Sequence, residues 1–167
     1  MAVVNTKSTV VTNADASPAV INTAQLASGR LRHGRGMIAV VSGDSIGSVY
    51  RAFRVKSNDL VSQLLLNTTA ITTCAADVGL YRTAADGGAV VDAAFFASAQ
   101  SLAVALSNTD ITHESGVITV ANMEKPIWQL LGLATDPQVD YDVAATLTAA
   151  AGSAGTICLT GHIVGRN

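Results

Sequence analysis

The segment Ser48-Val-Tyr-Arg-Ala-Phe-Arg-Val-Lys56 carries the clearest fold signal in this 167-residue chain. Val49, Arg51, Phe53 and Val55 alternate with the residues between them, and a period of two is typical of a β-strand. The arginines fall on both faces of this predicted strand. The segment therefore favours a β protein.

The sequence on both sides of this segment consists of short apolar runs separated by turn residues. Strands are predicted over Met37–Ser42, Ser48–Lys56, Leu60–Leu66 and Thr73–Thr83, with a return strand opening at Ala89–Val91 and a closing hairpin of Tyr141–Leu147 and Thr156–Val164. Gly87 and Gly88 form the turn before the return strand. The pattern predicts a mainly β fold, a β-sandwich or jelly roll, over residues 37–167.

One or two short helices are expected in the connections. Asp92 is placed to cap a helix over Ala93–Leu102, although the two phenylalanines there would equally anchor an apolar loop. A second helix is predicted from an N-cap at Asn122 to a stop at Gly132, with Pro126 in its first turn. The aromatic residues predicted to lie in the core are Phe95, Phe96 and Trp128.

Residues 1–36 read as an extended polar arm that ends in a basic cluster of Arg30, Arg32 and Arg35. Residues 1–56 hold seven of the ten Lys and Arg residues and only two acids, whereas residues 57–167 hold three cations and ten acids. The cluster is either a solvated hinge or a patch that docks onto an acidic surface.

The overall composition restricts the class of protein. Charged residues make up 13% and apolar residues 49%, so part of the surface is expected to be buried against a partner or against copies of the chain, as a dimer or trimer. The chain is not basic overall, which argues against nucleic acid. Cys74 and Cys158 are isolated and are expected to be reduced and buried.

No targeting or membrane segment is expected. Residues 1–7 lack the apolar core of a signal peptide. The long uncharged stretch between Asp142 and Arg166 is interrupted by Thr, Ser, Gly and His, so it does not predict a spanning helix.

The sharpest enzyme pattern combines Gly43-Asp44-Ser45-Ile46 with an Asp-x-x-His at Asp110 and His113. The two resemble the ends of a GDS-type esterase signature, with Ser45 as nucleophile, His113 as base and Asp110 as its orienting acid. The context fails, because Ser45 precedes a strand and no oxyanion element follows. We predict no catalytic residues.

No metal or cofactor site is predicted. His33, His113 and His162 are far apart in the sequence, and surface or hydrogen-bonded histidine is the favoured interpretation. The acidic group of Asp136, Asp140 and Asp142 lacks the density of a calcium loop, so a solvated loop is expected there.

Five phrases together resemble a family of small structural proteins of tailed bacteriophages. They are Gly29–Arg32, Asp44–Arg51, Asp77–Tyr81, Gly87–Asp92 and Glu124–Trp128. The resemblance implies a virion component, above all a head cement or decoration protein with a jelly-roll fold that bridges and stabilises major capsid subunits. It implies a place on the capsid surface of a virion assembled in the host cytoplasm. We expect the arm, residues 1–36, to lie on the capsid or on an adjacent copy, with Arg30, Arg32 and Arg35 facing acidic capsid surface.

Two other functions stay open. A tail- or fibre-associated binding module would be present in few copies, and host glycan is a candidate ligand for it. The GDS-type esterase is the weaker of the two, for the reasons given above.

Overall fold

The computed structural model describes residues 7–22 and 30–165. The elements are α1 (Thr9–Ala14), β1 (Leu31–Val40), β2 (Val49–Lys56), β3 (Leu60–Thr68), β4 (Ala75–Arg82), a 3₁₀ turn η1 (Ala84–Asp86), β5 (Val90–Ser101), β6 (Leu106–Asp110), α2 (Ile127–Leu130), β7 (Asp140–Ala149) and β8 (Gly155–Val164).

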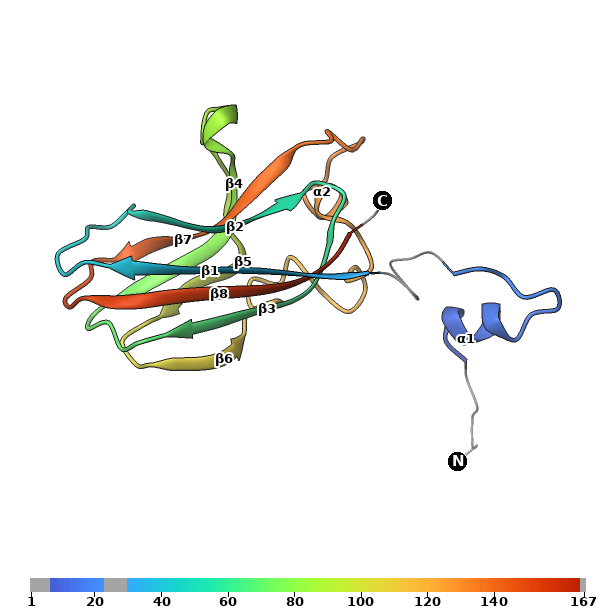
Figure 1. Cartoon of the computed structure of the whole chain (residues 1–167), viewed down its shortest axis with the longest axis horizontal. Helices are drawn as coiled ribbons and strands as arrows, with labels where there is room; N and C mark the ends of the chain where they lie inside the picture. Colours follow the sequence, from blue (N-terminus) through green and yellow to red (C-terminus); the bar gives the residue numbers. More distant parts are fainter. Residues whose placement is uncertain (1–6, 23–29, 166–167) are drawn as a thin grey trace.

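Eight strands form two four-stranded antiparallel sheets, which confirms the predicted β-sandwich. One sheet has the order β1-β8-β3-β6 and the other β2-β7-β4-β5. Consecutive strands such as β1 and β2, or β7 and β8, therefore lie in opposite sheets of the sandwich (Figure 1).

The predicted strands within residues 48–83 correspond to β2, β3 and β4, with ends that differ by a residue or two. The turn at Gly87 and Gly88 is also confirmed, because both residues have positive φ angles of 80° and 66°.

The boundary at residue 36 is wrong. Leu31–Gly36 pairs with β8 from Leu31↔Val164 to Gly36↔Leu159, so the basic end of the expected arm is part of the sandwich. Within the arm, Thr9–Ala14 is helical rather than extended, and Ser8 caps this helix by accepting from the Val11 amide.

Two helix predictions also need correction. The segment that follows Asp92 is strand β5, not a helix or loop, and Asp92 instead accepts a local hydrogen bond from the Ala94 amide. The predicted helix before Gly132 starts later than expected, at Ile127, since Asn122 closes a separate turn with the Thr119 amide.

The predicted closing hairpin is wrong in its pairing. β7 and β8 are adjacent in sequence, but β7 pairs with β2 and β4 while β8 pairs with β1 and β3. The Ala/Gly/Ser connection therefore crosses from one sheet to the other.

The core lies between the two sheets and draws on both. Phe95 and Phe96 are fully buried, as predicted, and their rings meet edge to face with centroids 4.9 Å apart. Trp128 is only half-buried, so its assignment to the core is wrong.

Glycines let the two sheets approach closely at the edge formed by β1 and β2. A Cβ on Gly36 would lie 2.2 Å from the Ala52 carbonyl oxygen, and a Cβ on Gly34 or Gly161 would lie 2.6 Å from the Phe53 ring. Phe53 of one sheet thus packs onto a glycine pair of the other. This contact closes the sandwich along the β1–β2 edge.

A candidate interaction surface at the β1–β2 edge

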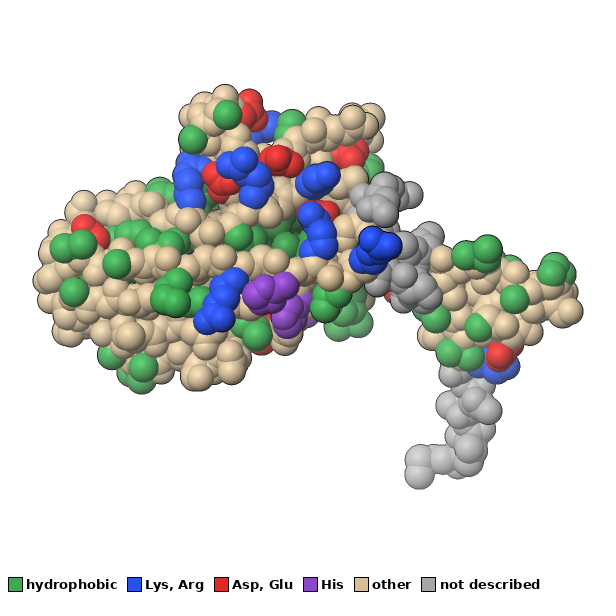
Figure 2. Space-filling model, viewed as in Figure 1, with side chains coloured by type: hydrophobic (Ala, Val, Ile, Leu, Met, Phe, Trp, Pro, Cys, Tyr) green, Lys and Arg blue, Asp and Glu red, His purple; other side chains and the backbone are tan. Residues whose placement is uncertain are grey.

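Cations from two sheets gather along the β1–β2 edge. Figure 2 shows Lys and Arg side chains in a band over these two strands. The members of this cationic edge are Arg30, which immediately precedes β1, Arg32 and Arg35 of β1, and Arg51, Arg54 and Lys56 of β2.

A β-bulge sets the positions of the β2 arginines. The pairing of β2 with β7 shifts between Arg51 and Phe53, which leaves Ala52 as the extra residue. Arg51 and Arg54 are three residues apart, and an uninterrupted strand would direct them to opposite faces. The bulge lets both reach Asp142 of β7, at 3.1 Å from Arg51 Nη1 and 2.9 Å from Arg54 Nε.

Arg51 is fixed in place by its contacts. It donates to the carbonyl oxygens of Arg82 at 2.7 Å and Gly88 at 2.8 Å, and its guanidinium lies over the Tyr81 ring. These bonds tie the η1 turn to the outer face of the sheet. Arg51 therefore has a structural role in the edge.

Arg54 and Lys56 face solvent. The Arg54 side chain is 55% exposed although it is paired with Asp142, and its hydrogen bond to that carboxylate raises the pKa of Arg54 further above its ordinary value. Asp142 faces two arginines, so the local charge stays positive. Lys56 is exposed at the end of β2.

The three arginines singled out from the sequence do not share one face. Arg32 is ion-paired with the buried Asp59, whose Oδ2 also accepts from the Lys56 amide at 2.8 Å. Arg35 lies over β8 on the outer face, where its Nε contacts Cys158 Sγ at 3.4 Å. Arg30 is exposed before the strand begins. The structure nevertheless places all three along the same edge of the sandwich.

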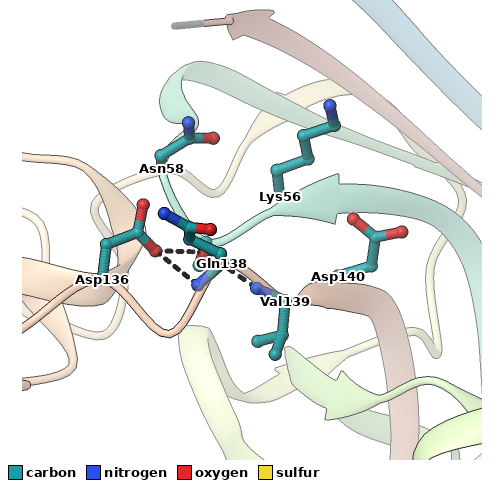
Figure 3. A pocket seen from close by; sticks show the side chains of 7 residues that line it. Lys56, Asn58, Asp136, Gln138, Val139 and Asp140 are labelled. Carbon is teal, nitrogen blue, oxygen red and sulfur yellow. Dashed lines mark hydrogen bonds between the residues drawn. The ribbon is translucent and has the colours of Figure 1, made fainter.

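Two shallow hollows adjoin the cationic edge. One, of about 350 Å³, lies among Arg51, Phe53, Arg54 and Asp142. The other, of about 410 Å³, lies at the end of β2, where Lys56 stands opposite Asp140 and Asn58 opposite Asp136 (Figure 3). Both are open surface features, lined by charged and polar side chains together with apolar ones such as Phe53 and Val139.

The acidic group predicted as a solvated loop is divided among different roles. Asp136 accepts from Ser57 Oγ at 2.5 Å and from the Gln138 amide at 2.9 Å, which orders the start of β7. Asp140 is exposed, and Asp142 is paired with arginines within the sheet. Within residues 7–22 and 30–165, no three His, Cys, Asp or Glu side chains converge as metal ligands.

The residues of the esterase pattern are not brought together. Ser45 lies in the β1–β2 connection at one end of the sandwich, whereas Asp110 ends β6 at the other (Figure 1). Asp110 accepts from Thr112 and Gln63, and His113 Nδ1 is bonded to the Ile118 carbonyl at 2.9 Å. The structure thus gives Ser45 neither base nor acid from this pattern.

Both cysteines are buried free thiols, as the sequence predicts. Burial raises the pKa of the Cys74 thiol above its ordinary value, which favours the unreactive protonated form. Among the described residues, no helix has the length and apolar character needed to cross a membrane.

Comparisons with known proteins point to the fold. No family model matches the sequence, and no curated protein matches it. A chain of the capsid of Ralstonia phage GP4 has a similar structure, with a TM-score of 0.54 and 16% identity over 83% of this chain and 86% of that one. A chain of the cyanophage Pam1 capsid asymmetric unit aligns with a TM-score of 0.45 and 10% identity, over 80% of this chain and 85% of that one.

The likeness to the GP4 capsid chain extends over most of both chains. At this level of identity it shows a shared fold. The β-sandwich of this chain is therefore similar to the fold of a chain in a phage capsid.

Proposed function

We propose that this chain is a virion structural protein of a tailed bacteriophage that acts as a cement or decoration protein on the major capsid shell. The observation that carries the proposal is the cationic edge on a β-sandwich whose fold is shared with a chain of the GP4 capsid. Four acids, Asp59, Asp136, Asp140 and Asp142, lie among or beside the six cations of the edge. The cations outnumber them, which suits the edge to an acidic partner.

The contacts to the shell are assigned to the exposed cations of the edge. Arg30 and Arg35 approach from the β1 side, and Arg54 and Lys56 approach from the β2 side. Arg32 adds the exposed part of its side chain, 46% by area, while Asp59 holds it in place. Each such surface pair contributes little by itself, about 0.2–1 kcal/mol.

Many identical contacts around a closed lattice add up to a large stabilisation. A protein of this kind needs a rigid β core and a recognition surface, and it needs no deep pocket. The low content of charged residues fits further burial against neighbouring copies, as a dimer or trimer on the capsid surface. Assembly of such particles takes place in the host cytoplasm.

The test is the copy number per particle. Purified virions are analysed by quantitative densitometry against the major capsid band. Hundreds of copies in a simple ratio to capsid subunits are expected. A dozen copies would assign the chain to the tail or its fibres instead, and absence from the particle would overturn the virion function.

A further inference from the structure

Two histidines that are far apart in the sequence are cross-strand neighbours in the structure. His33 of β1 pairs with His162 of β8, and both belong to the outer face of the β1-β8-β3-β6 sheet. Their ring centroids lie 5.8 Å apart with the ring planes at 43°. His33 is exposed and His162 half-buried, and Figure 2 shows histidine side chains in purple at the surface of this face.

A row of hydrogen bonds across the sheet orients one of the two rings. His162 Nδ1 lies 3.2 Å from Gln63 Oε1 on β3, and Gln63 Nε2 donates to Asp110 Oδ2 of β6 at 3.0 Å. Because Gln63 presents its oxygen to the ring, Nδ1 of His162 carries the proton. The lone pair of the neutral imidazole then resides on Nε2.

This arrangement has the features of a metal-binding histidine whose second nitrogen is held by an outer partner. Ligating histidines usually donate their other N–H to a carboxylate, carbonyl or water, which fixes the tautomer and raises ligand basicity. Asp110 polarises the Gln63 amide, and Gln63 in turn bonds the ring of His162. Asp110 therefore influences the basicity of His162 through Gln63. Its own pKa is lowered, although burial opposes this, by hydrogen bonds from Thr112 and Gln63, so it is charged at neutral pH.

The separation of the two rings suits a shared ion. With metal–nitrogen bonds of about 2.1 Å, two imidazoles on one tetrahedral metal have ring centres about 5–6 Å apart. The nearest cation on the same face is Arg35, and its Nε is directed to Cys158, on the side of Thr160 away from His162. Because the Arg35 guanidinium is directed away from His162, it repels a cation bound between the two histidines less strongly.

We propose that His33 and His162 form a two-histidine site for a borderline divalent transition ion such as Zn²⁺ or Ni²⁺, with water in the remaining positions. Imidazole ligands suit these ions, whereas Mg²⁺ prefers oxygen ligands. Gln63 is a positioning residue that acts through His162. The site does not depend on the capsid function proposed above.

The experiment is isothermal titration calorimetry of the full chain with ZnCl₂ and, separately, with NiCl₂ at pH 7.5. One ion per chain is expected to bind. His33→Gln and His162→Gln should each weaken binding at least tenfold, and Gln63→Leu, which retains both imidazoles, should weaken it about tenfold. Binding should also weaken in acid, because protons compete for the ring nitrogens.

His113→Gln is the matched control, since His113 is bonded to the Ile118 carbonyl and is expected to contribute nothing. MgCl₂ should give no binding heat. The circular dichroism spectrum of each variant verifies that the sandwich is folded. Equal affinity in the wild type and in either His33→Gln or His162→Gln would overturn the site, as would no binding of Zn²⁺ or Ni²⁺ at millimolar concentration.

Discussion

Single residues at the β1–β2 edge decide how closely the two sheets approach. Gly36 has no room for a side chain, because three backbone atoms of Ala52 would lie within 2.5 Å of its Cβ. Backbone cannot rotate away as a side chain can, so the strands would have to separate. The closed edge therefore depends on the absence of one methyl group.

Gly36→Ala is expected to lower the free energy of unfolding by about 1–3 kcal/mol or more, as overpacking does in other tight sites. Urea denaturation of the purified protein measures the change. Ala39→Ser on the exposed side of the same strand is the matched control, and it should stay within about 0.5 kcal/mol of the wild type. A wild-type stability for Gly36→Ala would show that the edge is not close-packed.

A hydrogen bond between Tyr50 of β2 and Asp44 of the β1–β2 connection is a second local interaction that affects stability. The phenol donates to Asp44 Oδ2 at 2.5 Å, and burial together with this acceptor raises the pKa of Tyr50 from 10.0 to about 12. Folding thus favours the protonated phenol. Its contribution to stability is complete below pH 10 and is lost as the pH rises through about 12.

The free energy of unfolding is therefore expected to fall more steeply between pH 10 and 12 in the wild type than in Tyr50→Phe. Denaturant titrations across this range measure the difference. Asp44→Asn should bring the pKa of Tyr50 down toward its ordinary value, which the NMR shift of the Tyr50 Cζ carbon reports. Identical slopes for wild type and Tyr50→Phe would contradict the assignment.

At the scale of elements, β1 marks where the body begins. Its first residue, Leu31, already pairs with Val164, so the β1–β8 ladder starts there. α1 has no buried residue. We expect the segment before β1 to serve contacts outside the body.

Deletion of residues 1–28 is expected to leave the Tm of the body unchanged while it weakens binding to capsids that lack the protein. Differential scanning calorimetry and co-sedimentation with such capsids make the two measurements. A large fall in Tm would show that the segment belongs to the folded body. Unchanged co-sedimentation would remove the arm from the proposed contact with the shell.

Local signals predicted some elements well and failed where tertiary pairing decides. The alternation around Phe53 identified β2 because it needs no knowledge of a partner strand. The start of β1 was missed because Gly34 and Gly36 look like hinge residues, although they are strand residues that lie against Phe53 and Ala52 respectively. β5 was missed because Asp92 makes a cap-like local bond within a strand whose pairing with β4 shifts register three times.

The site was predicted only in part for the same reason. The charge split indicated the arginines before and within β1. The charge split did not indicate that Arg54 and Lys56 lie beside the β1 arginines, because β1 and β2 belong to different sheets. The proximity of His33 and His162 follows from the pairing of β1 with β8, which no local pattern in the sequence specifies.

At the scale of the whole molecule, the cations are concentrated on one edge of the sandwich. Six of the seven cations in residues 1–56 line one edge, and residues 57–167 hold ten acids. Contacts between an exposed basic edge and an acidic shell are screened by salt, with a Debye length of about 10 Å at 0.1 M. Binding should accordingly depend on ionic strength.

The triple variant Arg35→Glu, Arg54→Glu, Lys56→Glu is expected to bind capsids at least about tenfold more weakly than the wild type at low salt. The difference in capsid affinity between the triple variant and the wild type should become smaller as the salt concentration is raised. Co-sedimentation over a series of NaCl concentrations measures both effects. Lys125→Glu in the β6–β7 connection is the control with one cation changed away from the edge, and it should bind as the wild type does. Equal binding by the triple variant would exclude the cationic edge as the contact.

The pairing of β1 with β8 has a mechanical consequence. The ladder of hydrogen bonds runs without a register shift from Leu31↔Val164 to Val40↔Gly155. The N-terminal segment joins β1 at Leu31, the first paired residue. Tension applied through that segment along the strand axis loads the ladder in shear, so its hydrogen bonds resist together instead of opening one after another. Under the cement function proposed above, a force transmitted through that segment would therefore meet the geometry in which an edge strand resists best.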